Sequence, residues 1–124
     1  MIINEDKLNG CDSKILYLKD YLLTMANDMN TDLIITSGYR SKEYNKSIGG
    51  SDKSWHCKGL AIDFYFKNVN VFKKVTDIYY LCEKQEGDFK GVTEFEVCRG
   101  KGKQHFHLAF GNEPKLETFT GVYK

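Results

Sequence analysis

Apolar residues recur at steps of three and four positions in two stretches of the chain, which is the spacing of one helix face. In the first stretch, which Asp12 or Ser13 can cap, the apolar positions are Ile15, Leu18, Leu22, Met25 and Met29. In the second, which Asn70 can cap and Gly87 can end, they are Val71, Val75, Ile78, Tyr79 and Cys82. Each stretch predicts a helix with one face in the core. A shorter helix is expected from about Lys42 to Ile48.

Other stretches have the length and composition of strands, namely residues 33–36, 60–66, 92–98 and 104–110. The clearest is 60–66, in which Leu60, Ile62, Phe64 and Phe66 share one face. A basic turn with glycines, residues 99–103, connects the last two stretches, which should therefore pair as a hairpin. The tail after Gly111, with the only proline at Pro114, has no strong periodicity.

These elements predict an α+β fold in which two or three helices pack on a small antiparallel sheet, leaving its other face open for a site. At 124 residues the chain is expected to form a single domain, 1–124. Hydrophobic residues make up 41%, charged residues 28%, and the net charge is +1. This composition is typical of a globular protein and gives no reason to expect nucleic acid or a membrane as partner. We expect a monomer.

Neither a membrane span nor a signal peptide is expected. The apolar runs are only a few residues long, and the first residues have neither a basic start nor an apolar stretch. We therefore expect synthesis in the cytoplasm. The four cysteines, Cys11, Cys57, Cys82 and Cys98, lack the close paired spacing of a zinc ribbon or a redox motif. They are predicted to be reduced and to pack as small apolar residues.

Polar residues that can bind a metal stand out against this apolar pattern. Asp63 interrupts the most hydrophobic strand, where a carboxylate needs a partner or a metal. His56 precedes it by seven residues, across a turn at Gly59, and His105 and His107 share one face of the last strand. A catalytic zinc has three protein ligands of this type and activates water for amide hydrolysis. Cys57, next to His56, would need a strained turn to reach the same ion.

Taken singly, each histidine could be an ordinary paired residue, and Arg40 could simply hold a turn. Together they belong to a longer pattern: Ser37-Gly38-Tyr39-Arg40-Ser41, Asn45, Gly49-Gly50-Ser51, Ser54, His56, Gly59, Ala61, Asp63 and His107. This pattern, within residues 36–110, resembles the zinc D-Ala-D-Ala carboxypeptidase family. That family includes vancomycin-resistance D,D-dipeptidases and phage L-alanyl-D-glutamate endolysins, and it shares a fold with the hedgehog signalling domain.

The resemblance implies roles for individual residues. His56, Asp63 and His107 would bind Zn²⁺, and Arg40 would bind a substrate carboxylate or steady the oxyanion, for which a permanently charged planar donor is suited. Ala109 stands where many relatives have an aspartate, which predicts weaker support of the ligands from the residues around them.

The chain departs from the family at the general base. Three residues before the last ligand, where relatives have an acidic residue, it has Gln104, which cannot take up a proton at neutral pH. Either the base has moved or the activity is weak or lost. Candidates for a moved base are Glu94 and Glu96 on the preceding strand, although these could form a solvated face. His105 has the better geometry, and a branch of the family carries a histidine at that position.

The leading hypothesis is a zinc metallopeptidase that cuts a peptide bond at a D-amino-acid junction of the peptidoglycan stem peptide. Such a protein would act on the cell wall, as a phage product released at lysis or carried by a virion, or as a single-domain bacterial enzyme. The alternative is a zinc-stabilised binding module or virion component of the same fold with little or no catalysis. Gln104 favours the alternative, whereas Arg40 favours the enzyme.

Overall fold

A computed structural model describes residues 1–51, 53–100, 104–112 and 117–123. The helices are α1 (Ser13–Asp28), α2 (Lys42–Ser47) and α3 (Val75–Glu83). The strands are β1 (Ile2–Ile3), β2 (Leu33–Ser37), β3 (Ala61–Phe66), β4 (Glu94–Gly100), β5 (His105–Ala109) and β6 (Glu117–Tyr123). Short 3-10 turns lie at Glu5–Leu8, Trp55–Lys58, Val71–Lys73 and Gly87–Phe89. Among these residues, no helix has the length and apolar character needed to cross a membrane.

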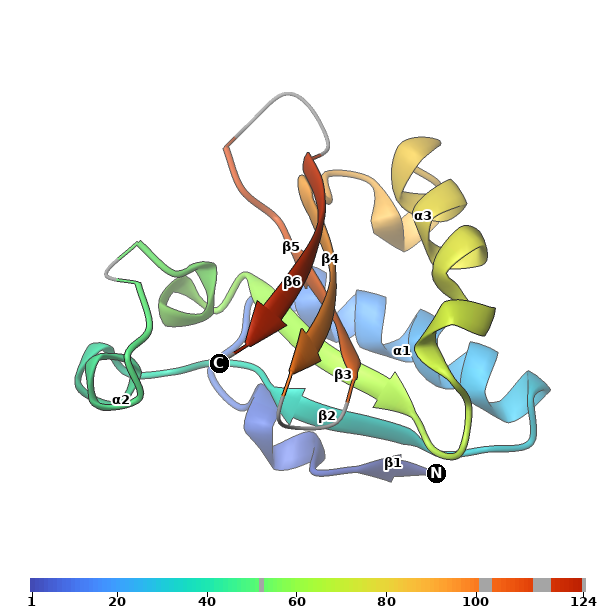
Figure 1. The fold of residues 1–124 in the computed structure, drawn as a ribbon, viewed down its shortest axis with the longest axis horizontal. Coiled ribbons are helices and arrows are strands. Elements are labelled where there is room, and N and C mark those ends of the chain that lie inside the picture. The colour runs from blue at the N-terminus through green and yellow to red at the C-terminus, as the bar shows by residue number, and fades with distance from the viewer. Residues whose placement is uncertain (52, 101–103, 113–116, 124) are drawn as a thin grey trace.

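The described strands form one sheet with the order β1-β2-β3-β5-β4-β6 (Figure 1). Its four inner strands, in the order β2-β3-β5-β4, pair antiparallel as predicted. The α+β class is confirmed. The sheet is mixed at its edges, because β1 pairs parallel to β2 and β6 pairs parallel to β4. The sequence pattern predicted neither edge strand: β1 has only two residues, and β6 lies in the tail that lacks strong periodicity.

Helices α1 and α3 bury their apolar faces in the same core cluster. Asp12 is the cap of α1, since its side chain accepts a hydrogen bond from the Lys14 N–H at 2.9 Å. Of the predicted apolar positions in α1, Ile15, Leu18 and Leu22 are fully buried, whereas Met25 and Met29 lie half-buried at its edge. The core face of α1 is thus the predicted one.

The second helix differs from its prediction at both ends. Asn70 caps the short turn Val71–Lys73, and α3 begins only at Val75. It ends at Glu83, before Gly87, because the chain reverses at Gln85, whose φ is +54°. The buried positions of α3 are Ile78 and Cys82, as the spacing predicted.

Strands β4 and β5 pair antiparallel, which confirms the hairpin. Within its predicted turn, residues 101–103 lie outside the described residues, as does Pro114. All four cysteines are described and none is in a disulfide; Cys82 and Cys98 are buried and the other two are half-buried.

The sheet presents its two faces to different surroundings. Ile62, Phe64, Phe106 and Leu108 point into the core cluster, where the rings of Phe64 and Phe106 lie 5.4 Å apart. Side chains alternate along a strand, so Asp63 and His107 point to the opposite face, away from α1 and α3. Helix α2 projects from the end of β2, to one side of the sheet (Figure 1).

Candidate metal centre

The register of the sheet places polar residues of four strands in one row. Asp63 of β3 is the direct partner of His107 in β5 and of Ser37 in β2, and His107 is also the partner of Glu96 in β4. Directly opposed residues on one face lie close enough for their side chains to touch. The row Ser37, Asp63, His107 and Glu96 is therefore a product of strand pairing and not of nearness in sequence.

A short turn brings His56 to this row. The Ser54 hydroxyl accepts a hydrogen bond from the His56 N–H and starts the turn Trp55–Lys58. Gly59 ends it with a φ of +69°, which favours glycine, and a Cβ at this position would lie 2.7 Å from the carbonyl oxygen of Gly10. The chain then enters β3, and His56 Nε2 lies 3.2 Å from Asp63 Oδ1.

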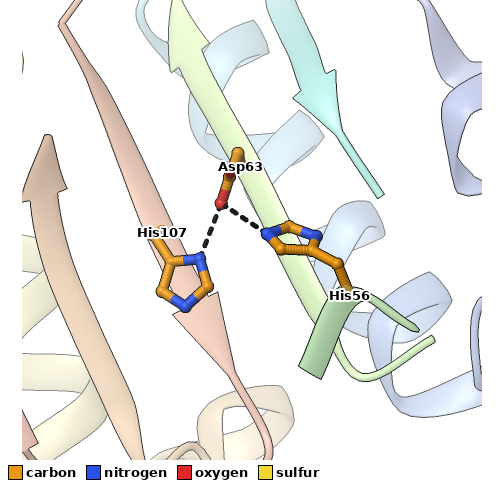
Figure 2. Close-up of side chains that lie close together, drawn as sticks. All are labelled: His56, Asp63 and His107. Carbon is orange, nitrogen blue, oxygen red and sulfur yellow. Dashed lines mark hydrogen bonds and ion pairs between the residues drawn. The ribbon is translucent and has the colours of Figure 1, made fainter. Parts of the chain in front are cut away.

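His56, Asp63 and His107 form a buried group in which one ligand atom of each lies within 4.8 Å of the others (Figure 2). The Nδ1 atom of His107 is 2.7 Å from Asp63 Oδ1, so both imidazoles face the same carboxylate oxygen. Two imidazole nitrogens and one carboxylate oxygen are the donor set of a catalytic zinc site. The group can therefore hold a metal ion.

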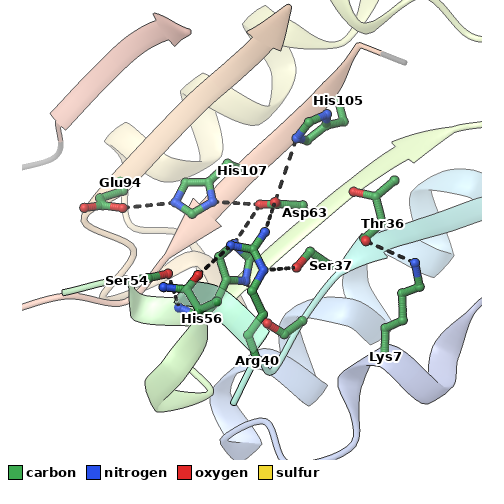
Figure 3. Close-up of polar contacts among 12 residues, drawn as sticks. Lys7, Thr36, Ser37, Arg40, Ser54, His56, Asp63, Glu94, His105 and His107 are labelled. Carbon is green, nitrogen blue, oxygen red and sulfur yellow. Dashed lines mark hydrogen bonds and ion pairs between the residues drawn. The ribbon is translucent and has the colours of Figure 1, made fainter. Parts of the chain in front are cut away.

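Contacts on the outer side of each imidazole support this assignment. The Nδ1 atom of His56 lies 2.7 Å from the Gly38 carbonyl oxygen. Because this oxygen can only accept a hydrogen bond, the proton of the neutral ring is on Nδ1, and the lone pair of Nε2 points toward Asp63 and His107. The Nε2 atom of His107 lies 3.0 Å from Glu94 Oε1 (Figure 3). Metal-binding imidazoles usually donate their second N–H to such an acceptor. These residues fit a bound metal.

The same contacts shift two pKa values in the metal-free centre. Burial on its own would lower the pKa of His107, but its hydrogen bonds to Asp63 and Glu94 raise it to about 10. Burial would raise the pKa of Asp63, but hydrogen bonds to His107 and His56 hold it well below its ordinary value. At neutral pH the metal-free centre thus contains a protonated His107 beside an ionised Asp63, and a metal must displace a proton when it binds.

These shifts predict how the stability of the metal-free protein depends on pH. The contribution of His107 is fully present below its ordinary pKa of 6.5 and is lost as the pH rises toward about 10. That of Asp63 is present above its ordinary 3.8 and is lost as the pH falls. Urea unfolding with a chelator present should therefore give the largest unfolding free energy between about pH 3.8 and pH 6.5. The decline at high pH should be smaller in Asp63→Asn, and a native stability that does not decline would contradict the expectation.

Arg40 lies beside the group, with Nη2 at 3.7 Å from Asp63 Oδ2. Two side chains hold it there: Arg40 Nε donates to Ser37 Oγ at 2.9 Å, and Nη1 donates to Asn45 Oδ1 at 3.3 Å. Asn45 is only 2% exposed and donates in turn to the Ser51 carbonyl oxygen. The structure therefore holds a permanent positive charge next to the three-residue group, and Arg40 is the residue for which the family resemblance implied a place in the site.

The candidates for the general base occupy different places. The Nε2 atom of His105 is 3.8 Å from Asp63 Oδ2, so this side chain faces the centre. Glu96 lies on the same face, and burial raises the pKa of its carboxyl group, although His107 and a hydrogen bond with Cys98 oppose the shift. Gln104 is exposed and lines a hollow with Tyr65, Phe66 and residues 68–71. Cys57 is not a member of the buried group.

Glu94 has a role that the sequence did not reveal. The sequence offered Glu94, together with Glu96, as a candidate for a moved base, and in the structure its Oε1 atom lies 3.0 Å from the outer nitrogen of His107. Glu94 is the cross-strand partner of Ala109, where the sequence predicted weaker support of the ligands, and its carboxylate contacts His107. Asn45 and the Gly38 carbonyl also act through contacts that only the fold creates.

One of three comparisons with known proteins assigns the chain to a family. No match was found among curated proteins or among solved structures. The model of one family, described as Peptidase M15, matches residues 1–108, which include His56, Asp63 and His107. This is the family of the zinc D-Ala-D-Ala carboxypeptidases, so the resemblance seen in the sequence is confirmed. The chain belongs to the Peptidase M15 family.

Proposed function

We propose that this peptidase uses zinc to hydrolyse a peptide bond at a D-amino-acid junction of peptidoglycan stem peptides. The observation that carries the proposal is the buried group of His56, Asp63 and His107 with Arg40 fixed beside it. Zinc held by these three residues would supply a Lewis acid for the scissile carbonyl and for the attacking water. The protein would act at the cell wall, as a phage product released at lysis or carried by a virion.

Arg40 supports a catalytic site over a structural one. Structural zinc sites are closed by four protein ligands, whereas the described group has three, which would leave a fourth position on the ion for water or a substrate. Ser37 and Asn45 orient the Arg40 guanidinium before any substrate arrives, so little ordering is left for binding. A fixed guanidinium can bind a carboxylate of the stem peptide or stabilise the charge that develops on the scissile carbonyl oxygen.

His105 is the proposed general base. A base must lie within hydrogen-bond reach of the water that attacks, and His105 is a titratable side chain whose Nε2 atom faces the centre, 3.8 Å from Asp63 Oδ2. Glu94 is engaged with His107, and Gln104 cannot take up a proton. Glu96 is the second candidate, because burial raises the pKa of its carboxyl group toward the range useful for a base.

The other candidate function is a zinc-stabilised binding module of the same fold. It is favoured by Gln104, which replaces the acidic residue expected from the family resemblance. In that case the centre would bind metal and stabilise the fold without cleaving a peptide.

Incubation with defined stem peptides tests the proposal. The substrates are a pentapeptide that ends in D-Ala-D-Ala with a free carboxylate, the same peptide as its amide, and a peptide with an internal L-Ala-D-Glu bond. The zinc-loaded chain should cleave at least one of them, and a chelator should stop the reaction. Preference for the free carboxylate over the amide indicates a carboxypeptidase, whereas cleavage of the internal bond indicates an endopeptidase.

Two variants serve as controls for this assay. His56→Ala should lose both zinc and cleavage, because it removes a ligand atom from the group. Gln104→Glu restores the residue type expected for the family base. If the native chain binds zinc but cleaves none of the peptides, whereas Gln104→Glu cleaves them, the peptidase proposal is wrong and the binding module is supported.

A further inference from the structure

We infer that Glu94 is a positioning residue for the metal centre, which fixes the orientation and tautomer of His107. This inference rests on the proposed metal site of His56, Asp63 and His107. The Oε1 atom of Glu94 lies 3.0 Å from His107 Nε2, while His107 Nδ1 faces Asp63 at 2.7 Å (Figure 3). Glu94 therefore binds the ring nitrogen that does not point into the group.

The two nitrogens of an imidazole have complementary roles when the ring binds a metal. The ligand nitrogen must offer its lone pair, so the proton of the neutral ring belongs on the other nitrogen. A carboxylate at Nε2 stabilises a proton there and thereby leaves Nδ1 as the ligand atom. It also makes the ring a more basic ligand and restricts its rotation.

The strand pairing explains why Glu94 can reach His107. Glu94 is the cross-strand partner of Ala109, and His107 lies two residues from Ala109 on the same face of β5. The Ala109 side chain is short, which leaves the Glu94 carboxylate free to extend diagonally to the His107 ring. The Glu94 side chain is 24% exposed, so its contact with His107 lies at the edge of the centre and not in its interior.

Glu94 completes an arrangement in which both imidazoles have an outer acceptor. His56 has a neutral backbone oxygen, that of Gly38, whereas His107 has a charged carboxylate. A charged acceptor forms the stronger hydrogen bond. The affinity of the centre for metal should therefore depend strongly on the Glu94 side chain.

Zinc affinity, measured by competition with a chromophoric chelator at constant pH, tests this assignment. Glu94→Ala should weaken zinc binding by about 10- to 100-fold, the range typical of lost outer partners of a ligand. Glu94→Gln should lose less, because its amide oxygen can still accept the hydrogen bond. Glu96→Gln is the matched control: it removes a charge from the same strand and the same face but leaves the Glu94 contact in place. It should weaken zinc binding less than Glu94→Ala does, because Glu96 lies across from His107 while the outer nitrogen of that ring is held by Glu94.

A nuclear magnetic resonance measurement separates positioning from a general loss of stability. In the zinc-loaded native protein, the Nε2–H of His107 should give a protected imidazole signal, which Glu94→Ala should lose while the backbone spectrum stays folded. Glu94→Gln has nearly the native size and keeps the test available if the alanine variant does not fold.

Several results would overturn the assignment. One is a Glu94→Ala affinity within about threefold of the native value, and another is an equal loss in Glu94→Gln and Glu96→Gln, which would indicate charge alone. If the native chain binds zinc but Glu94→Ala is unaffected, only this inference fails. If the native chain binds no zinc, the proposed metal site fails with it.

Discussion

Asp63→Ala should remove stoichiometric zinc from the protein and abolish its peptidase activity. Asp63 Oδ1 is the atom that both His56 and His107 face, so its loss leaves two imidazoles without the oxygen donor between them. Loss of an outer partner alone typically costs 10- to 100-fold in metal affinity, so loss of a ligand should weaken zinc binding by more than about 100-fold. Metal analysis after dialysis and chelator competition measure this effect.

A surface carboxylate provides the control for Asp63→Ala. Asp77 on α3 is largely exposed and pairs with Lys74, and α3 packs on the core face of the sheet, opposite to the face that carries Asp63 and His107. Asp77→Ala should retain native zinc content and native cleavage. The proposed centre would be wrong if purified Asp63→Ala, folded by circular dichroism, still carried one zinc per chain.

His105→Ala should retain zinc and lose most of the catalytic rate. His105 faces the centre from beside His107 but is not a member of the three-residue group, so the metal should remain bound. Removal of a general base typically lowers kcat by about 100-fold or more, with a smaller effect on KM. Steady-state kinetics on the best stem peptide, together with zinc content, measure both quantities.

Glu96→Gln distinguishes the two candidate bases. Glu96 is the direct cross-strand partner of His107, and burial raises the pKa of its carboxyl group, which suits a general base. If Glu96→Gln loses the rate and His105→Ala does not, the base is Glu96 and the assignment of His105 is wrong. Equal and large losses in both would indicate that the two side chains move the proton together.

Much of the fold could be predicted from the sequence because its periodicity is local and strong. The apolar spacing of α1 and α3 and the alternation in β3 each follow from side-chain geometry within one element. The edge strands β1 and β6 could not be predicted. Their pairing depends on the exposed edges of β2 and β4, which no local pattern describes.

The candidate site also combines residues that the sequence predicted with contacts that only the fold creates. Residue types and spacing, read with the family resemblance, predicted His56, Asp63 and His107 as ligands and Arg40 as a residue of the same site. The structure brings these four together. Glu94 and Glu96 were indistinguishable in the sequence, since they share one face of one strand. The register of β4 against β5 separates them, setting Glu96 across from His107 and Glu94 across from Ala109.

The sequence by itself thus determined which side chains are available for chemistry and which face of its strand each one occupies. The tertiary structure decided which of them meet. Asp63 and His107 are 44 residues apart and touch only because β3 and β5 pair in one register. A shift of one residue would turn either side chain to the opposite face. That register is set by the whole sheet and its core, so the contacts of Glu94, Asn45 and Gly38 with the centre could be found only in the folded chain.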